Sequence, residues 1–211
     1  MKRKLVAIVG GSGAGKSYLA SRIASRLGFG ESIIIRLDDF YRDLSLMPLW
    51  ERDVVNFDEP DAIDWEEFLS ALDRIINQDE PAQLPIYDYK THSRLPLRRV
   101  FEPKQLTIIE GLWLIHRSDL RGLFCYSVYV DCPEGLRLQR RIERDARERG
   151  RSEESVVRQF RQTVSPMHNR YVEPQRAFAD VVIKSPFAEE EIEKIVQTIK
   201  DFVVDDDNGE R

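Results

Sequence analysis

The sequence opens with a short apolar run that leads directly into a glycine-rich loop and then into a helical pattern. The apolar run is Leu5–Val9, and the helical pattern covers Lys16–Leu27 and stops at Gly28. The loop has the spacing GxxxxGK[ST], and its residues are Gly10, Gly11, Ser12, Gly13, Ala14, Gly15, Lys16 and Ser17. This spacing between a strand and a helix is typical of a phosphate-binding loop, so it predicts an α/β fold from the first residues onward.

The residue types in this loop suit a nucleoside triphosphate with Mg²⁺. Glycines let successive backbone N–H groups turn inward around a phosphate at a helix N-terminus, where the helix dipole also favours an anion. We expect Lys16 to bridge the β- and γ-phosphates and to neutralise charge in the transition state, and the Ser17 hydroxyl to ligate Mg²⁺. The loop predicts ATP or GTP as ligand but names no reaction, because ATPases, GTPase switches and small-molecule kinases share it.

Five short runs rich in β-branched residues predict strands, and helical patterns lie between them. The runs are apolar throughout, which indicates a parallel sheet covered on both faces. We therefore predict an α/β fold of the P-loop NTPase type, with a doubly wound parallel five-stranded sheet and helices on both faces. The predicted strands are Leu5–Val9, Ile33–Leu37, Leu106–Glu110, Tyr126–Asp131 and Asp180–Lys184.

Two segments interrupt the alternation of strands and helices. The prolines within residues 81–103 suit a β-hairpin that lies off the main sheet, and residues 133–152 form an arginine-rich helical lid. We expect one domain over residues 1–204 and a disordered tail over residues 205–211. Asp64 is expected to cap the helix that follows it, with Glu67 in the capping-box position.

Charge and composition narrow the class of partner. The 211 residues carry a formal net charge of −5, which argues against nucleic acid as the main partner because binding to a phosphate backbone needs a basic surface. No apolar run reaches transmembrane length, and the first apolar run is too short for a signal peptide. Cys125 and Cys132 are interpreted as plain thiols. We expect a cytoplasmic protein with no membrane partner.

Acidic side chains follow two of the predicted strands. Asp38 and Asp39 come directly after the second strand, and Glu110 ends the third. A kinase for a hydroxyl acceptor needs a carboxylate near that hydroxyl, and Asp38 is our candidate. Glu110 is placed to bind Mg²⁺ directly or through water. Each acid could instead cap a turn.

Further motifs, taken together and in order, resemble the uridine kinase (uridine-cytidine kinase) family over nearly the whole chain. This resemblance implies transfer of the γ-phosphoryl group of ATP to the 5′-hydroxyl of uridine or cytidine, with Asp38 as the acceptor-side base and Ser17 with Glu110 at the Mg²⁺ site. It also implies a homo-oligomer, commonly a tetramer. The motifs that carry it are Asp38–Asp43, Asn56–Asp64, Tyr87–Arg94, Arg140–Arg151 and Val164–Val182.

The same resemblance implies how the acceptor would be held. Asp58 and Arg141 would hold the ribose 2′- and 3′-hydroxyls, which is chemically reasonable because a carboxylate can accept two hydrogen bonds from a vicinal diol. Tyr41 would line the pocket. Tyr87 and His92 on the hairpin would read the pyrimidine. Without the family, the aromatic ring could be an ordinary hairpin residue and the histidine a solvent-exposed one.

Seven arginines lie between Arg137 and Arg151, interspersed with acids. A solvated helix face with intrahelical ion pairs is one interpretation. The resemblance implies instead a lid in which Arg144 and Arg149 reach phosphate and Gly150 allows a sharp turn. Gln159, on the next helix, would be a further substrate-side residue by resemblance.

Some positions depart from the family pattern, and two other functions stay open. Asp39 stands where the family usually has serine, Ser165 where it has a basic residue, and the segment 184–187 where it has glycines, which leaves the choice of ATP or GTP open. One alternative is a kinase of a sugar phosphate, similar to phosphoribulokinase. The other is a regulatory protein that binds a nucleotide without transferring a phosphoryl group.

Overall fold

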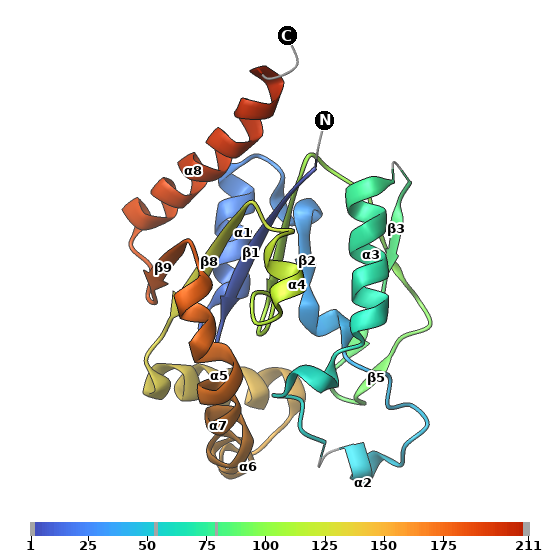
Figure 1. The fold of residues 1–211 in the computed structure, drawn as a ribbon. Coiled ribbons are helices and arrows are strands. Elements are labelled where there is room, and N and C mark those ends of the chain that lie inside the picture. Colours follow the sequence, from blue (N-terminus) through green and yellow to red (C-terminus); the bar gives the residue numbers. More distant parts are fainter. Residues whose placement is uncertain (1–2, 53–54, 79, 209–211) are drawn as a thin grey trace.

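A five-stranded parallel sheet forms the centre of the molecule (Figure 1). The computed structural model describes residues 3–52, 55–78 and 80–208. The strand order is β2-β7-β1-β8-β9, and every neighbouring pair is parallel. This confirms the predicted fold class. The strands are β1 (Lys4–Gly10), β2 (Ile34–Arg36), β7 (Leu106–Gly111), β8 (Tyr126–Asp131) and β9 (Val181–Lys184).

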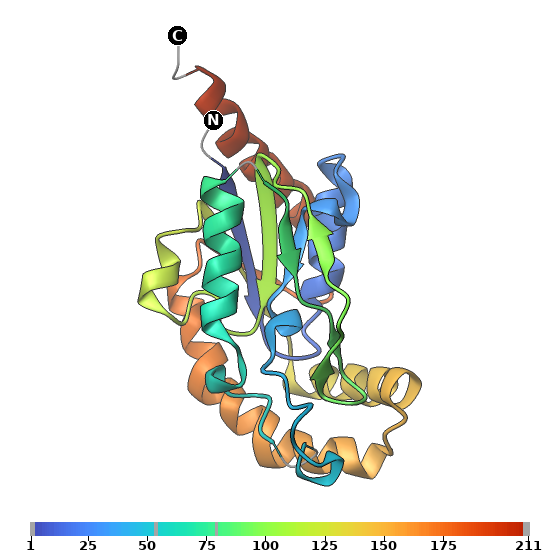
Figure 2. The same cartoon turned by 90° about the vertical axis from the view of Figure 1, so that its right-hand side faces the viewer.

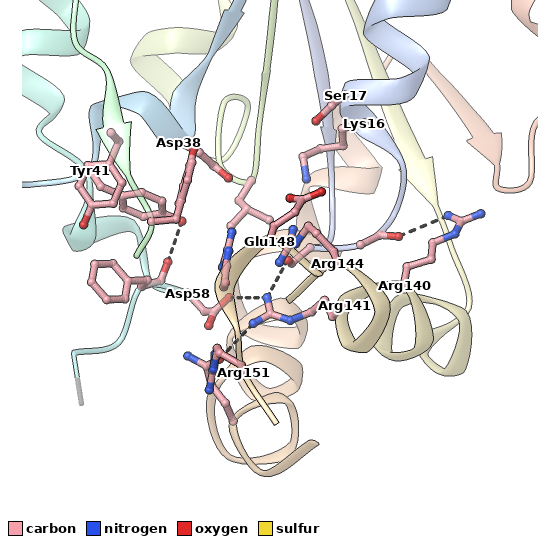
Figure 3. Close-up of a pocket in the computed structure, with 18 of the residues that line it drawn as sticks. Lys16, Ser17, Asp38, Tyr41, Asp58, Arg140, Arg141, Arg144, Glu148 and Arg151 are labelled. Atoms are coloured by element: carbon pink, nitrogen blue, oxygen red, sulfur yellow. Dashed lines mark hydrogen bonds and ion pairs between the residues drawn. The ribbon is translucent and has the colours of Figure 1, made fainter. Parts of the chain in front are cut away.

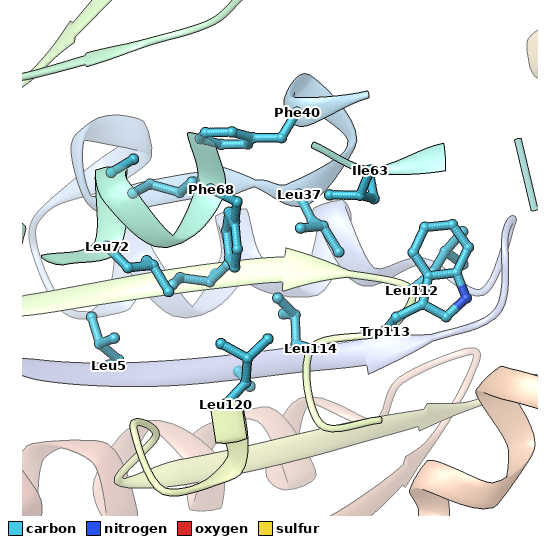
Figure 4. Packing of buried hydrophobic residues seen from close by; sticks show 14 of the residues in the cluster. Leu5, Leu37, Phe40, Ile63, Phe68, Leu72, Leu112, Trp113, Leu114 and Leu120 are labelled. Carbon is cyan, nitrogen blue, oxygen red and sulfur yellow. The ribbon is translucent and has the colours of Figure 1, made fainter. Parts of the chain in front are cut away.

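Helices cover both faces of this sheet, because alternate residues of each strand point to opposite sides. In β1, Val6 and Ile8 pack with α1 (Lys16–Arg26) and α8 (Glu189–Asn208). Leu5, Ala7 and Val9 face the other layer, which contains α3 (Trp65–Asn77) and α4 (Ser118–Arg121). Figure 2 shows α3 and the opposite helices on either side of the sheet, and Figure 4 shows the packing on the α3 side.

Two strands are shorter than predicted. The second strand stops at Arg36, since Leu37 begins a 3₁₀-helix, η2 (Leu37–Phe40), that carries both aspartates; a 3₁₀-helix, η1 (Gly30–Ile33), precedes the strand. The last strand begins at Val181, because the Asp180 side chain accepts hydrogen bonds from Ser127 N (2.7 Å) and Ser127 Oγ (2.6 Å). Strand edges therefore end where side-chain hydrogen bonds replace the ladder.

The segment of residues 81–103 forms two small antiparallel pairs away from the main sheet. Strands β3 (Ala82–Leu84) and β6 (Arg99–Phe101) make one pair, and β4 (Tyr87–Asp88) and β5 (Ser93–Arg94) make the other. The short helix α2 (Leu49–Arg52) lies in the connection before α3, and Pro60–Ala62 is a single 3₁₀ turn, η3.

The start of α3 confirms half of the predicted capping box. Asp64 Oδ1 accepts a hydrogen bond from Glu67 N at 3.1 Å, as an N-cap does. Glu67 does not return to Asp64 N, which donates to Phe40 O at 2.8 Å instead. The Glu67 carboxylate pairs with Arg94 and Arg98 of the hairpin segment, so it ties α3 to that segment.

The C-terminal third of the chain supplies a long helix and several wide or tight turns. Helix α5 ends at Gly150, which has a φ of 67° and allows the reversal into α6. Helix α8 extends to residue 208, so residues 205–208 are helical rather than a disordered tail, because no helix-breaking residue precedes Gly209. Residues 209–211 lie outside the described residues. The elements of this region are α5 (Glu134–Arg149), α6 (Glu153–Gln159), η4 (Phe160–Val164), α7 (Ser165–Met167), η5 (His168–Val172) and η6 (Glu173–Phe178).

Both cysteines, Cys125 and Cys132, are free thiols. Within the part of the chain that the structure describes, no helix combines the length and the apolar character needed to cross a membrane.

Candidate active site

A cavity of about 810 Å³ lies where the carboxyl ends of the strands meet the arginine-rich helix (Figure 3). Most of the predicted site residues line it, although they come from distant parts of the sequence. Gly10, Gly11 and Ala14 do not, because they form the back of the loop. The predicted residues on the wall are Ser12, Gly13, Gly15, Lys16, Ser17, Asp38, Tyr41, Asp58, Tyr87, His92, Glu110, Arg141, Arg144, Arg149 and Gln159.

The glycine-rich loop wraps into a backbone cradle at the start of α1. A Cβ at Gly13 would lie 2.5 Å from Arg137 O, and the φ of 79° at this glycine is in the left-handed region. A Cβ at Gly10 would lie 2.7 Å from Val130 O. Lys16 Nζ donates to Gly11 O at 3.2 Å, so the amine folds over the loop. This arrangement can hold the phosphates of a nucleotide.

A pair of oxygen ligands lies beside the loop at the end of β7. Ser17 Oγ donates to Glu110 Oε1 at 2.7 Å. Burial raises the pKa of the Glu110 carboxyl, while Lys16 acts in the opposite direction. These groups, with Asp38 nearby, are hard oxygen donors of the kind that Mg²⁺ prefers. A divalent cation would also relieve the cost of burying the carboxylate.

Asp38 and Asp39 occupy the 3₁₀ turn after β2 and differ in environment. Asp38 Oδ1 is buried and, among the residues that the structure describes, has no hydrogen-bond partner. A buried acceptor of this kind is costly unless a ligand satisfies it. Burial raises the pKa of Asp39 to about 6, with Arg36 and Arg99 opposing the shift. The aspartate that replaces the usual serine therefore titrates near neutral pH.

Aromatic side chains line the end of the cavity beyond Asp38. Tyr41 Oη donates to Phe57 O at 3.0 Å, and the rings of Tyr41 and Tyr87 lie 5.4 Å apart. The rings of Phe57 and His92 are stacked at 4.4 Å with an interplanar angle of 14°. Tyr87 is buried, and His92 has a φ of 49°, so both are fixed parts of the wall. Such a wall can accept a planar ring.

Arg141 joins this end of the cavity to the phosphate loop. Its Nη1 donates to Ser12 Oγ at 2.7 Å and lies 3.8 Å from Asp58 Oδ1, and its Nη2 donates to Gln159 Oε1 at 3.2 Å. Burial raises the pKa of the Asp58 carboxyl, and Arg141 opposes the shift. The side chain of Arg141 is 5% exposed. The arginine helix is therefore not a solvated face at this point.

The two arginines predicted to reach phosphate contact an acid of the same helix. Arg144 Nε donates to Asp145 Oδ1 at 2.8 Å, and Arg149 Nε lies 3.6 Å from the same oxygen. The guanidinium of Arg149 also lies 4.9 Å from the centre of the Tyr89 ring. Their contact with phosphate stays a prediction. The arginines that contact the phosphate loop here are Arg141 and Arg140.

Sequence reasoning missed several residues of the site. Arg140 donates to Gly13 O (3.3 Å) and Ala14 O (3.1 Å), although the sequence gave it no separate role. Phe57 and Tyr89 line the cavity beside predicted residues. Their positions next to Asp58 and Tyr87 in sequence were the available signal, but aromatic residues in such segments are as common in cores.

A second layer behind the loop was also missed. A Cβ at Gly11 would lie 2.9 Å from both Arg137 Nη1 and His168 Nδ1, so these two side chains support the loop from behind. Burial, followed by Arg137 and Lys16, lowers the pKa of His168 to about 4. The histidine is therefore neutral at physiological pH.

Known proteins resemble this chain in sequence and in fold. The model of the Phosphoribulokinase / Uridine kinase family matches residues 5–190. A uridine kinase from Lactobacillus helveticus is 37% identical over 183 residues, which cover 86% of each chain. One from Chloroflexus aggregans is 40% identical over 178 residues, covering 84% of this chain and 85% of that one.

Two solved structures resemble the fold. The structure of a possible uridine kinase from Bacillus stearothermophilus has a TM-score of 0.55 and 22% identity, with 86% of this chain and 89% of that chain covered. A D-glycerate 3-kinase from Cryptococcus neoformans has a TM-score of 0.61 and 16% identity, covering 89% and 88%. At these identities the structures support the fold alone.

Proposed function

Because this chain belongs to the phosphoribulokinase / uridine kinase family and is a kinase, we propose that it transfers the γ-phosphoryl group of ATP to the 5′-hydroxyl of uridine or cytidine. The observation that carries this proposal is one continuous cavity. A phosphate-binding loop lines one side of it, and a buried carboxylate with an aromatic wall lines the other. A donor and a neutral ring-bearing acceptor would therefore meet in one enclosed space.

Asp38 is the proposed base and orienting group. Its unsatisfied Oδ1 can accept the hydrogen bond of the acceptor hydroxyl and then its proton as the oxygen bonds to the γ-phosphorus. The bond from that phosphorus to the β–γ bridging oxygen breaks, and the nucleoside diphosphate leaves. Lys16 would neutralise the charge that moves onto the leaving phosphate. Catalysis would then rest on positioning and electrostatics.

Ser17 and Glu110 are the proposed holders of Mg²⁺, with Asp38 close to the same site. The fit rests on their hard oxygens and on the buried carboxylate of Glu110. When bound, Mg²⁺ would supply positive charge that stabilises the phosphates of the donor. The protein ligands are few, as is usual for Mg²⁺, which keeps several waters and binds phosphate oxygens.

The acceptor end supports a nucleoside better than a sugar phosphate. Asp58 and Arg141 present an acceptor and a donor at one point, which suits a vicinal diol. Arg144 and Arg149 share Asp145, and Arg151 donates to Gln159 Oε1, so their charges are already partly satisfied. The stacked pair of Phe57 and His92, beside Tyr41 and Tyr87, provides apolar ring faces.

The test is a coupled assay of ADP release with ATP and Mg²⁺ against uridine, cytidine, purine nucleosides and ribulose 5-phosphate. The proposal expects turnover with the two pyrimidine nucleosides alone. Turnover with ribulose 5-phosphate would replace it with a sugar-phosphate kinase. Nucleotide binding without turnover on any acceptor would favour the regulatory alternative.

Assembly and location belong to the same proposal. We propose a cytoplasmic homotetramer, and exposed apolar side chains near α2 and on the hairpin, including Leu46, Trp50 and Leu97, support contact between subunits. Light scattering on the purified protein would measure the mass directly. A monomeric mass at micromolar concentration would contradict this part.

A further inference from the structure

The cavity has a second end, on the far side of the phosphate loop from Asp38. Three elements meet there: α1 with Tyr18, α5 with Arg140, and the turn between β9 and α8 with Ser185 and Phe187. Tyr18 and Arg140 line the cavity, and Figure 3 shows Arg140 at the opposite side from Asp38 and Tyr41. The turn of residues 184–187 is also the segment that departs from the family pattern.

Phe187 lies directly against the phosphate loop. A Cβ at Gly15 would be 3.3 Å from both Cε2 and Cζ of this ring. The rings of Phe187 and Tyr18 are nearly parallel, with an interplanar angle of 7° and centres 6.2 Å apart. The side chain of Tyr18 is exposed, at 54%. Together the two rings form an aromatic platform beside the first turn of α1.

The platform is held in place from behind. Arg22 Nη1 donates to Tyr18 Oη at 2.7 Å, and Arg22 Nη2 donates to Glu189 Oε1 at 2.6 Å. This chain of contacts connects α1 to α8 and fixes the orientation of the tyrosine ring. An exposed ring held in this way loses little side-chain entropy when a ligand stacks on it.

The polar groups beside the platform are already committed. Arg140 Nη1 donates to Gly13 O, to Ala14 O at 3.1 Å and to Ser185 Oγ at 2.9 Å. Ser185 is buried, so its hydroxyl serves the guanidinium rather than a ligand. The side chains that form this end of the cavity therefore offer ring faces and a fixed guanidinium plane.

In-line transfer decides what lies at this end. The attacking oxygen and the leaving oxygen are on opposite sides of the γ-phosphorus. If Asp38 holds the acceptor, the rest of the donor must extend away from Asp38, over Gly15 and the first turn of α1. We infer that the base of the donor nucleotide stacks on the platform of Tyr18 and Phe187, and that this chain accepts ATP and GTP alike. This inference rests on the proposed function.

The chemical reason for dual use is the nature of the contact. Adenine and guanine differ in the hydrogen-bonding groups on their edges, whereas their faces are both large π surfaces. Stacking on an aromatic side chain tolerates any base and favours the larger purines. Discrimination between the two would require a polar group aimed at the base edge, and Arg140 and Ser185 are occupied with each other.

Calorimetry on the full chain tests this inference without any turnover. ADP and GDP should bind with dissociation constants within about threefold of each other. Phe187→Ala should weaken both by about tenfold, as expected for a lost stacking contact, and should leave the affinity for tripolyphosphate unchanged. Phe187→Leu, which keeps the apolar bulk without the π face, should lose most of the affinity, and Phe187→Trp should keep it.

Three results would overturn the inference: unchanged ADP affinity in Phe187→Ala, full affinity in Phe187→Leu, or a preference for one purine above tenfold in the unmodified protein. Weaker binding of tripolyphosphate in Phe187→Ala would show a damaged loop instead and would also overturn it. These outcomes are independent of the acceptor, so failure to phosphorylate uridine or cytidine would remove the proposed function and leave the result on the donor base readable.

Discussion

The donor side and the acceptor side of the cavity are built in different ways. Phosphate recognition rests on the eight consecutive residues 10–17, and most of its contacts would come from backbone N–H groups. The acceptor side is assembled from side chains of η2, the segment before α3, the hairpin, α5 and α6. The comparison teaches that donor binding depends on local backbone shape, whereas acceptor binding depends on the packing of distant elements.

The sharpest division between the two sides is expected at Asp38. Asp38→Asn keeps the shape but removes the base, so kcat should fall about a thousandfold, while the dissociation constant for ADP stays within about twofold. Steady-state kinetics and calorimetry would measure the two quantities. Near-normal turnover would remove Asp38 from its role, and loss of nucleotide binding would show that the two sides are not separable.

Arg141 should break the division, because it contacts both sides. Arg141→Ala leaves Asp58 buried without its ion pair, and the free energy of unfolding should fall by about 3 kcal/mol. Urea unfolding would measure this loss. The double variant with Asp58→Asn should recover part of it, since the stranded charge is gone. Equal losses in Arg141→Ala and in the double variant would contradict the pairing at 3.8 Å.

Gly13 should affect the donor side alone. Gly13→Ala forces a Cβ against Arg137 O and a left-handed φ, which costs about 2 kcal/mol or roughly thirtyfold in donor affinity. Calorimetry with ADP would measure it. Gly122→Ala is the matched control, because a Cβ there meets nothing within 4 Å. Equal affinity in both variants would show that the cradle tolerates a side chain.

Asp39 should give the smallest effect, visible as a dependence on pH. Its pKa is raised to about 6 in the fold, against about 4 in an unfolded chain. The folded state then holds the proton more tightly, so this group lowers stability as pH rises from about 4 to about 6 and keeps the full penalty above that range. Asp39→Asn should therefore stabilise by about 2 kcal/mol at pH 8 and by little at pH 4.

Thermal unfolding of the Asp39→Asn variant and the unmodified chain across this range would measure that difference. A gain that is equal at both pH values would contradict the raised pKa. A loss at pH 8 would show that the charge is needed by Arg36 and Arg99.

The extent to which sequence predicted this molecule follows the same division. The loop could be placed because its residues are contiguous and its spacing is specific. The strand before Asp38 was predicted too long, since the 3₁₀ turn at Leu37 depends on contacts that propensity does not carry. The arginine helix could not be resolved into roles, because equal side chains at neighbouring positions separate only when the helix is docked. Arg140 then contacts the loop, whereas Arg144 contacts Asp145.

Arg141 gives the cavity one further property. Because a single guanidinium bonds Ser12 of the loop and lies beside Asp58 and Gln159 of the acceptor side, occupation of either side would alter the position of the group that serves the other. Thermodynamics makes such an effect reciprocal: whatever factor the donor applies to acceptor affinity, the acceptor applies to donor affinity. The two substrates would thus act as heterotropic effectors of each other within one pocket.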